Sequence, residues 1–182
     1  MKEINDENII TLMQNAATLE RGFSLLMDKY QEPLYWLVRR MVNDHDDAND
    51  VTQNAFIKVF RGFHNYKGDA KLYTWLYRIA SNEAITFINQ RNKKGITSLD
   101  AVPMAYEKSA DSYFDGDETQ RLLKNAISQL PDKQRLVFNM RYYEEMPYEQ
   151  MSQVLDTSVG ALKASFHHAV KKIEAFVKGL EF

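Results

Sequence analysis

The sequence predicts an all-α protein of two small helical domains joined by an acidic linker, with a helix-turn-helix in the second domain. Three observations lead to this fold class. Apolar residues recur every three or four positions along most of the 182 residues. With only four prolines and seven glycines, helix breakers are scarce, and no segment alternates strictly between apolar and polar residues as a half-buried strand would. A middle segment loses this periodicity and is rich in acidic residues.

The charge distribution places the domain boundaries. Residues 1–95 carry 13 basic and 12 acidic side chains, and residues 120–182 carry nine and seven. The linker, residues 96–119, carries one basic and six acidic side chains, so it accounts for the net charge of −2. Neither domain is strongly basic, which does not favour tight DNA binding by the chain alone, because DNA affinity rests largely on contacts between cations and phosphates. Binding to DNA alongside a larger partner fits this distribution better.

Composition also indicates the compartment. The chain contains no cysteine, which excludes disulfide bonds and thiolate metal sites. Its first residues are polar and unlike a signal peptide, and no apolar run approaches the roughly 18 residues that a spanning helix requires. These features predict a soluble, cytoplasmic protein.

The first domain is expected to contain three main helices. The first begins at Pro33, a residue suited to the first helical position, and places one apolar stripe on Leu34, Leu37, Val38 and Met41. Residues 43–47 provide a turn and possible N-caps for the second helix. Residues 65–70 are a predicted loop, and a long third helix covers residues 71–89.

In the second domain, helices are expected near residues 120–129, 132–143, 148–155 and 159–178. The last two have the plan of a helix-turn-helix: a short amphipathic helix, a break at Asp156-Thr157, and a longer helix that Ser158 can cap. An ordinary pair of packed helices is the alternative interpretation.

The predicted third helix of the first domain interleaves aromatic and cationic residues. Lys71, Trp75, Arg78 and Asn82 recur at steps that share one helix face, and tyrosines lie beside it. Single-stranded DNA is bound in this way, with unpaired bases stacked on rings and phosphates near cations. Alternatively, the aromatic residues belong partly to the core.

A third feature is polar. The preceding helix presents Asp46, Asp47, Asp50, Gln53 and Asn54 on its exposed side. This pattern is typical either of a docking face for a partner or of helix capping combined with a solvated face.

These three features follow one another in the order found in the extracytoplasmic-function group of bacterial sigma factors, which the sequence resembles. Residues 46–60 resemble that family's helix for binding core polymerase, and residues 71–82 its helix for promoter melting and minus-ten recognition. Residues 130–135 are similar to the start of the family's second domain, and residues 158–163 to the start of its minus-thirty-five recognition helix. The resemblance covers about residues 20–94 and 120–178.

The resemblance implies three groups of binding residues and no catalytic residue, metal or cofactor. The implied polymerase-binding residues are Asp47, Asp50, Gln53, Asn54 and Ile57. The implied minus-ten residues are Lys67, Lys71, Tyr73, Trp75, Arg78 and Asn82. The implied minus-thirty-five residues are Ser158, Lys163, Ser165, His167, His168 and Lys171.

It also implies the partners: core RNA polymerase, promoter DNA as duplex and as melted single strand, and an anti-sigma factor. The loop at residues 65–70 is expected to hold a base flipped out of the duplex. The acidic linker is expected to mimic nucleic acid and lie in the polymerase's RNA-exit channel.

One departure from the family pattern concerns the recognition helix. The family often carries two arginines where this chain has Ser165 and His168. Histidine is mostly neutral at pH 7 and attracts phosphate weakly, so this helix is expected to bind more weakly or to recognise a different sequence.

Parts of the sequence are also compatible with two other functions. A stand-alone helix-turn-helix regulator is expected to have a more basic recognition surface and a dimerisation helix, and neither is evident. A metal-dependent hydrolase is suggested by the acidic residues around His45. Adjacent histidines at 167 and 168 point to different helix faces, however, which disfavours a shared metal site there. The expectation is therefore a protein that is not an enzyme.

Overall fold

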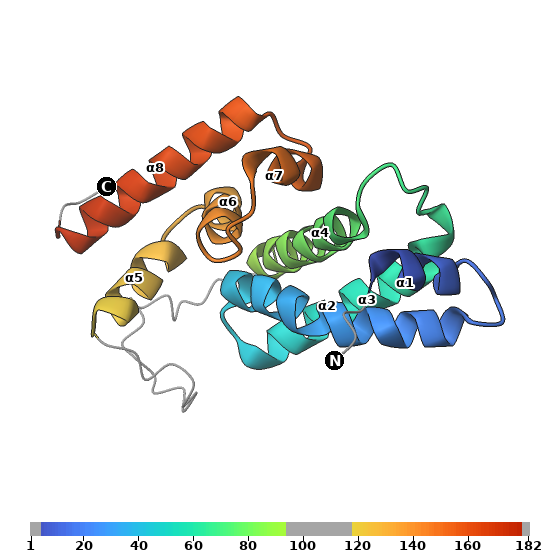
Figure 1. Ribbon diagram of the computed structural model, residues 1–182. Coiled ribbons are helices and arrows are strands. Elements are labelled where there is room, and N and C mark those ends of the chain that lie inside the picture. Colours follow the sequence, from blue (N-terminus) through green and yellow to red (C-terminus); the bar gives the residue numbers. More distant parts are fainter. Residues whose placement is uncertain (1–4, 94–117, 180–182) are drawn as a thin grey trace.

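The computed structural model describes residues 5–93 and 118–179, and within these ranges every regular element is helical (Figure 1). In chain order the elements are α1 (Asp6–Met13), α2 (Leu19–Val42), α3 (His45–Gly62), the 3-10 helix η1 (Phe63–Asn65), α4 (Leu72–Lys93), α5 (Glu118–Ser128), α6 (Asp132–Tyr142), α7 (Tyr148–Leu155) and α8 (Val159–Val177). The all-α prediction is confirmed. None of the described helices is long and apolar enough to cross a membrane. The acidic segment predicted at residues 96–119 lies outside the described residues except for its last two.

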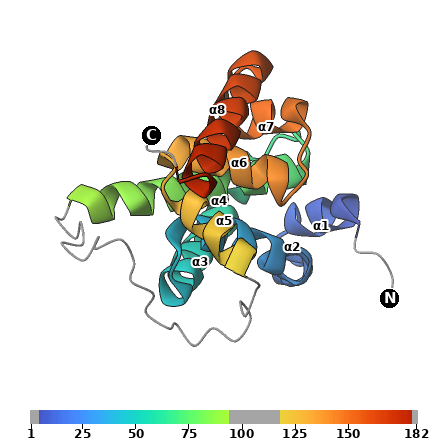
Figure 2. The ribbon, with the colours of Figure 1, turned by 90° about the vertical axis from the view of Figure 1, so that its left-hand side faces the viewer.

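The described helices form two groups, α1–α4 and α5–α8, which pack against each other. Helix α6 lies against α2, and α7 lies against α4 (Figures 1 and 2). Buried residues of α6, α7 and the start of α8 join the hydrophobic core of the first group, so that one core cluster continues from one half into the other. This contact was not expected from the sequence, which left the arrangement of the two halves open.

Helix α2 is the central helix of the first group. Contrary to the expectation that a helix begins at Pro33, α2 starts at Leu19 and contains this proline. The buried face runs through both sides of position 33, with Leu26 and Tyr30 before it and Leu34 after it. A proline inside a helix costs about 3 kcal/mol through a lost hydrogen bond and a clash. Packing of this continuous face against α1, α3 and α4 outweighs that cost.

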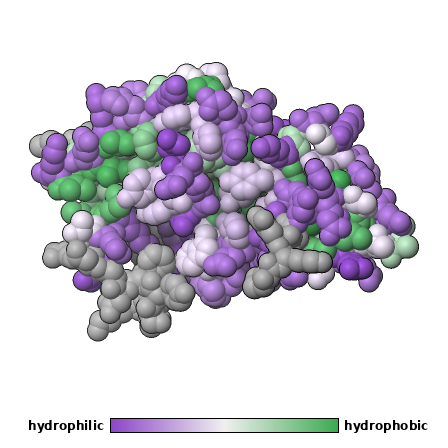
Figure 3. Space-filling model, in the orientation of Figure 1, coloured by the Kyte–Doolittle hydropathy of each residue, from purple (hydrophilic) through white to green (hydrophobic). Residues whose placement is uncertain are grey.

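The second group has a small core of its own, formed by α5, α6 and α8. It consists of Ala126, Ile127, Leu130, Phe138, Ala169 and Ile173. Apolar residues remain exposed around it: Leu122 is 37% exposed and Val177 is 47% exposed. Figure 3 shows hydrophobic side chains gathered over the C-terminal half of α8. So few buried residues give the second group less core than the first.

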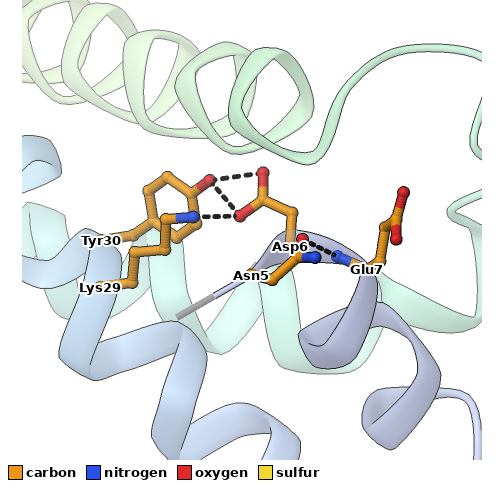
Figure 4. A network of polar contacts seen from close by, with 5 residues as sticks. All are labelled: Asn5, Asp6, Glu7, Lys29 and Tyr30. Carbon is orange, nitrogen blue, oxygen red and sulfur yellow. Dashed lines mark hydrogen bonds and ion pairs between the residues drawn. The ribbon is translucent and has the colours of Figure 1, made fainter. Parts of the chain in front are cut away.

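Helix α1 was not anticipated from the sequence, and it is held on α2 by polar contacts and close packing. The Asp6 carboxylate accepts hydrogen bonds from Lys29 Nζ at 2.6 Å and from the Tyr30 hydroxyl at 2.8 Å (Figure 4). Asn5 caps the helix by accepting a hydrogen bond from the Glu7 amide. A Cβ added at Gly22 would lie 2.7 Å from the Met13 side chain, so only glycine permits this approach.

Candidate nucleic-acid interface

The first candidate surface is the exposed side of α3. Asp44 caps this helix, its carboxylate accepting a hydrogen bond from the Asp47 amide at 2.9 Å. Asp47 also forms an ion pair with Arg91, 3.4 Å away at the end of α4. Burial and the neighbouring Asp44 raise the pKa of the Asp47 carboxyl above its usual value, and Arg91 opposes that rise. Of the implied polymerase-binding residues, Asp47 is therefore already engaged within the chain.

The other implied residues of α3 are free of such contacts. Asp50, Gln53 and Asn54 are exposed. Ile57 is 47% exposed, and among the described residues few other large apolar side chains are this accessible. An exposed apolar residue surrounded by polar ones is typical of a protein contact surface.

A groove of about 620 Å³ runs between α2 and α3 beside this surface. Gln53 and His45 of α3 line it, together with Tyr35 and Trp36 of α2, which the sequence did not single out. The Tyr35 hydroxyl is 2.7 Å from His45 Nδ1, a hydrogen bond that joins the two helices. No sequence signal identified this groove, because aromatic residues in an amphipathic helix are typical of core positions.

The second candidate surface is the loop between η1 and α4. Phe63, Tyr66 and Trp75 form an aromatic cluster here, and the Tyr66 and Trp75 ring centroids are 5.2 Å apart. The Tyr66 hydroxyl donates to the Ala70 carbonyl at 2.7 Å, which closes the loop. Gly68 has φ of +79°, a conformation that side-chain-bearing residues rarely adopt. These contacts fix the shape of the loop and leave Trp75 half-buried.

A pocket of about 450 Å³ adjoins the loop. Most of the residues that line it are apolar or aromatic, and they come from α1, α2, α3, η1 and the segments that follow α1 and η1: Met13, Gln14, Ala16, Leu19, Phe60, Phe63, His64 and Tyr66. A pocket of this chemistry beside an aromatic cluster can accept a planar ring. Its residues from α1 and the following turn could not be assigned from the sequence, since they precede the loop by about 50 positions.

The cationic residues around the loop are exposed. Lys67 and Lys71 flank its glycine, and Arg78 and Asn82 follow along α4 on the same side as Trp75. Tyr73 points elsewhere: its ring centroid is 4.1 Å from that of the fully buried Tyr77. Trp75 thus contacts the aromatic residues of the loop, whereas Tyr73 contacts Tyr77, and both side chains are half-buried against the core of the first group.

The third candidate surface is the pair α7–α8. Asp156 has φ of +49° and ends α7, and the Ser158 hydroxyl caps α8 by accepting a hydrogen bond from the Ala161 amide at 3.3 Å. Leu162, Ala169 and Ile173 bury the inner face of α8. These features confirm the predicted break and cap, and the helix pair has the helix-turn-helix plan.

On the outer side of α8, the implied residues are accessible. Lys163, His167, His168 and Lys171 are exposed, as is the cap Ser158, and Ser165 is half-buried. Lys163 Nζ lies 5.7 Å from the centre of the Tyr148 ring, which directs this cation along α7. Two lysines therefore supply the permanent positive charge among the implied residues of this helix. Among the described residues, no group of three or more histidine, aspartate or glutamate side chains is arranged to hold a metal ion.

Comparisons with known proteins identify the family of this chain. The family model for Sigma-70 region 2 matches residues 26–94, and that for Sigma-70, region 4 matches residues 120–173. The RNA polymerase sigma-H factor of Pseudomonas aeruginosa is 31% identical, over 96% of this chain and 95% of its own length. The ECF RNA polymerase sigma-E factor of Escherichia coli is 27% identical, over 98% and 97%.

Two solved structures share the fold. The sigma factor RpoE of Bartonella quintana, in complex with the anti-sigma factor NepR, has a TM-score of 0.67 and 19% identity, covering 86% of this chain and 96% of its own. CnrH, in complex with the cytosolic domain of CnrY, also has a TM-score of 0.67 and 19% identity, covering 96% and 97%. At this identity the two structures establish the arrangement of helices alone.

Proposed function

This chain belongs to the extracytoplasmic-function group of sigma-70 factors, and we propose how its surfaces divide promoter recognition between the two halves. A sigma factor binds core RNA polymerase and directs it to promoters, where DNA is melted and transcription begins. The matches to both regions in one chain favour this function over a stand-alone helix-turn-helix regulator, for which the region 2 half has no use. Sigma factors are not enzymes, and the relatives give no support to a metal-dependent hydrolase.

The polymerase-binding surface is assigned to α3 and the groove beside it. Asp50, Gln53, Asn54 and Ile57 are its exposed contacts, and the groove between α2 and α3 extends it. Asp47 has a different role in this proposal. Because it pairs with Arg91 and its amide is capped by Asp44, it fixes the start of α3 relative to α4.

The minus-ten surface is assigned to the loop and the exposed side of α4. Trp75 offers a ring for stacking an unpaired base, while Lys67, Lys71 and Arg78 offer charges for the phosphates. The apolar pocket of about 450 Å³ next to Tyr66 is the proposed place for a base that leaves the duplex. Tyr73 supports this surface through its packing on Tyr77 and does not itself stack on DNA.

The minus-thirty-five surface is assigned to the N-terminal half of α8. A recognition helix places its first turns in the major groove, where Lys163 and His167 reach base edges or phosphates. Ser165 and His168 replace permanent cations of the family pattern, so the affinity of this half for duplex DNA is low. When both halves are bound to one polymerase, this low affinity is compensated. The second contact with DNA is then intramolecular.

An anti-sigma factor is the further partner that we propose. One of the two similar structures is of a sigma factor in complex with an anti-sigma factor, and this chain shares its fold. Action on RNA polymerase also places the chain in the cytoplasm. The proposed role of the acidic linker in the RNA-exit channel concerns residues outside those described.

The observation that carries this function is the presence, in one chain, of an aromatic and cationic loop next to α4 and a capped helix-turn-helix. The test is co-elution of the purified chain with bacterial core RNA polymerase, followed by run-off transcription from pooled genomic fragments. Stoichiometric binding and transcripts that start downstream of one shared motif are expected. A folded chain that neither binds core polymerase nor supports initiation would contradict the proposal.

A further inference from the structure

Helix α1 and the turn after it form one wall of the pocket next to the Tyr66 loop. Met13 at the end of α1, its C-cap Gln14, and Ala16 in the turn line this pocket of about 450 Å³. The region 2 family model begins at residue 26, so this wall precedes the residues that define the family match. A segment outside that match therefore contributes to the pocket proposed for a base.

The turn that carries part of this wall is held by its own side chains. The Thr18 hydroxyl donates a hydrogen bond to the Leu12 carbonyl at 2.8 Å. The Asn15 side chain accepts one from the Ala17 amide at 3.0 Å. These two bonds tie the turn to the end of α1, so the wall has a defined shape.

Contacts with α2 fix the whole wall in place. The Asp6 carboxylate at the start of α1 holds Lys29 and Tyr30 (Figure 4). Burial and the hydrogen bond to Asp6 raise the pKa of the Tyr30 hydroxyl, so that it remains a donor. At the other end of α1, Met13 packs directly on Gly22. Both ends of the helix are thus anchored next to the pocket.

Gln14 is the lining residue best suited to read a base. The other side chains of the lining that carry polar groups are those of His64 and Tyr66. The Tyr66 hydroxyl is already bonded to the Ala70 carbonyl. Each ring nitrogen of a neutral histidine is either a donor or an acceptor, whereas the exposed amide of Gln14 offers a donor and an acceptor side by side. Such an amide matches the paired groups on the edge of a base.

The surroundings of the pocket indicate what enters it. The rings of Phe60, Phe63 and Tyr66 line the pocket, and the exposed cations Lys67 and Lys71 flank the adjoining loop. Aromatic surfaces beside cations fit single-stranded nucleic acid, whose bases stack on rings while its phosphates pair with cations. The ligand that this chemistry favours is an unpaired base of a DNA strand that passes the loop.

We propose that α1 is a wall of the base pocket, and that Gln14 reads the edge of the base that enters it. Asp6, Lys29 and Tyr30 are positioning residues, because they hold α1 against α2 and do not line the pocket. The inference rests on the proposed function. It adds to that function a residue for base selection, on a helix outside the region 2 match.

A site-directed crosslink tests where Gln14 lies in the promoter complex. The chain has no cysteine, so Gln14→Cys creates a single thiol. This variant, bound to core RNA polymerase, is given promoters that carry a thiol-tethered base at one non-template position at a time. A disulfide to DNA, seen as a species of combined mass on a denaturing gel, is expected at one minus-ten position. Asn8→Cys, an exposed residue near the other end of α1, is the control and should form none there.

A change of amide to carboxylate tests whether Gln14 selects the base. Cytosine and uracil have the same ring size, but cytosine has an amino donor where uracil has a carbonyl acceptor. Gln14→Glu leaves acceptors only, so it should shift the ratio of run-off transcripts from templates with these bases at the crosslinked position about tenfold toward cytosine. Asn8→Asp is the matched control, because it makes the same chemical change on α1 outside the pocket lining.

The anchor of α1 gives a further test. Asp6→Ala removes both hydrogen bonds to α2, and in the Gln14→Glu chain it should reduce the shift toward cytosine several-fold at unchanged polymerase binding. Lys58→Ala, which removes an ion pair between α3 and α4 of the same half, should leave the shift intact. The ratio of the two templates separates positioning of Gln14 from general destabilisation, which would lower transcription from both equally.

The outcomes distinguish this role of α1 from the proposed function. If the unsubstituted chain initiates transcription but Gln14→Cys forms no crosslink in the minus-ten element, the role of α1 is overturned. The same holds if Gln14→Glu and Asn8→Asp give the template ratio of the unsubstituted chain. Absence of initiation by the unsubstituted chain with core polymerase would overturn the proposed function, and the role of α1 with it.

Discussion

The two halves of this chain differ in how many apolar residues each buries in a core of its own. The α1–α4 half buries a large set of residues from α1, α2, α3 and α4 around Leu34, and it presents its loop and α3 on a firm base. The α5–α8 half has six buried residues in a core of its own, and its remaining buried residues share the core of the first half. Because burial of apolar surface is a main source of stability, the second half depends on its contact with the first half for much of its burial. The first half is therefore the stable platform of the molecule.

The sharpest way to test this contrast is a matched pair of core truncations. Leu34→Ala, at a fully buried position, should lower the free energy of unfolding by about 2 to 5 kcal/mol. Leu130→Ala, in the smaller core, should cost less, since its surroundings can relax into solvent-accessible space. Urea denaturation followed by circular dichroism measures both. Equal losses in the free energy of unfolding would contradict the conclusion that the first half has the larger core.

A second prediction separates promoter melting from polymerase capture at Trp75. Trp75→Ala should reduce open-complex formation by the loss of one stacked base, about 1 to 3 kcal/mol, while initial capture of polymerase is unchanged. Permanganate footprinting of melted promoter DNA, compared with polymerase co-elution, separates the two steps. Trp75→Phe is the matched control, because it keeps an aromatic face on which a base can stack. Equal loss in both assays would refute the stacking role.

Substitutions on the exposed side of α3 should have the reverse effect, because they should weaken polymerase binding. Ile57→Ala should weaken polymerase binding by about 1 kcal/mol, because it removes an exposed apolar contact at the centre of the proposed surface. Replacing Asp50 and Gln53 together should act in the same direction. Competition binding against a labelled reference sigma factor measures this, with Glu20→Ala of α2 as the surface control. Unchanged affinity for polymerase would remove α3 from the interface.

A smaller effect, on binding to duplex DNA, is expected from a substitution in α8. Lys163→Ala should weaken binding to the minus-thirty-five duplex and reduce the slope of log affinity against log salt by about 1, as expected for one lost phosphate contact. Lys178→Ala, beyond the recognition half of the helix, should leave the slope unchanged. A salt slope that is the same for the Lys163→Ala and unsubstituted holoenzymes would show that Lys163 makes no phosphate contact.

The smallest effect is a pH dependence at Asp47. Its pKa in the folded chain is raised by burial and by Asp44, so the fold favours the protonated form. The associated stabilisation is present at low pH and is lost as pH rises through the folded pKa. Because Arg91 lowers this pKa, Arg91→Ala should raise it further, as carbon-13 NMR titration of the carboxyl group can show. A pKa that is indifferent to Arg91 would mean that the ion pair does not form in solution.

The sequence alone was sufficient for features that depend on neighbouring residues. It predicted an N-cap within residues 43–47, which the structure assigns to Asp44, and it predicted the cap at Ser158, the break at Asp156 and the helical class. Capping and periodicity are decided within one or two helical turns, which is why they can be predicted locally. The ordered motifs also pointed to the family that the comparisons then established. The three groups of binding residues remain predictions.

What required tertiary structure were the contacts between distant segments. Pro33 lies inside α2 because packing on three other helices outweighs a local penalty. The Arg40 and Glu144 side chains meet across 104 positions, and Asp47 meets Arg91 across 44. No periodicity encodes such pairs, since each depends on how whole helices pack and which faces they bury together. Local sequence therefore determined the helices and their ends, and the packing of the helices decided which surfaces are free and which are covered.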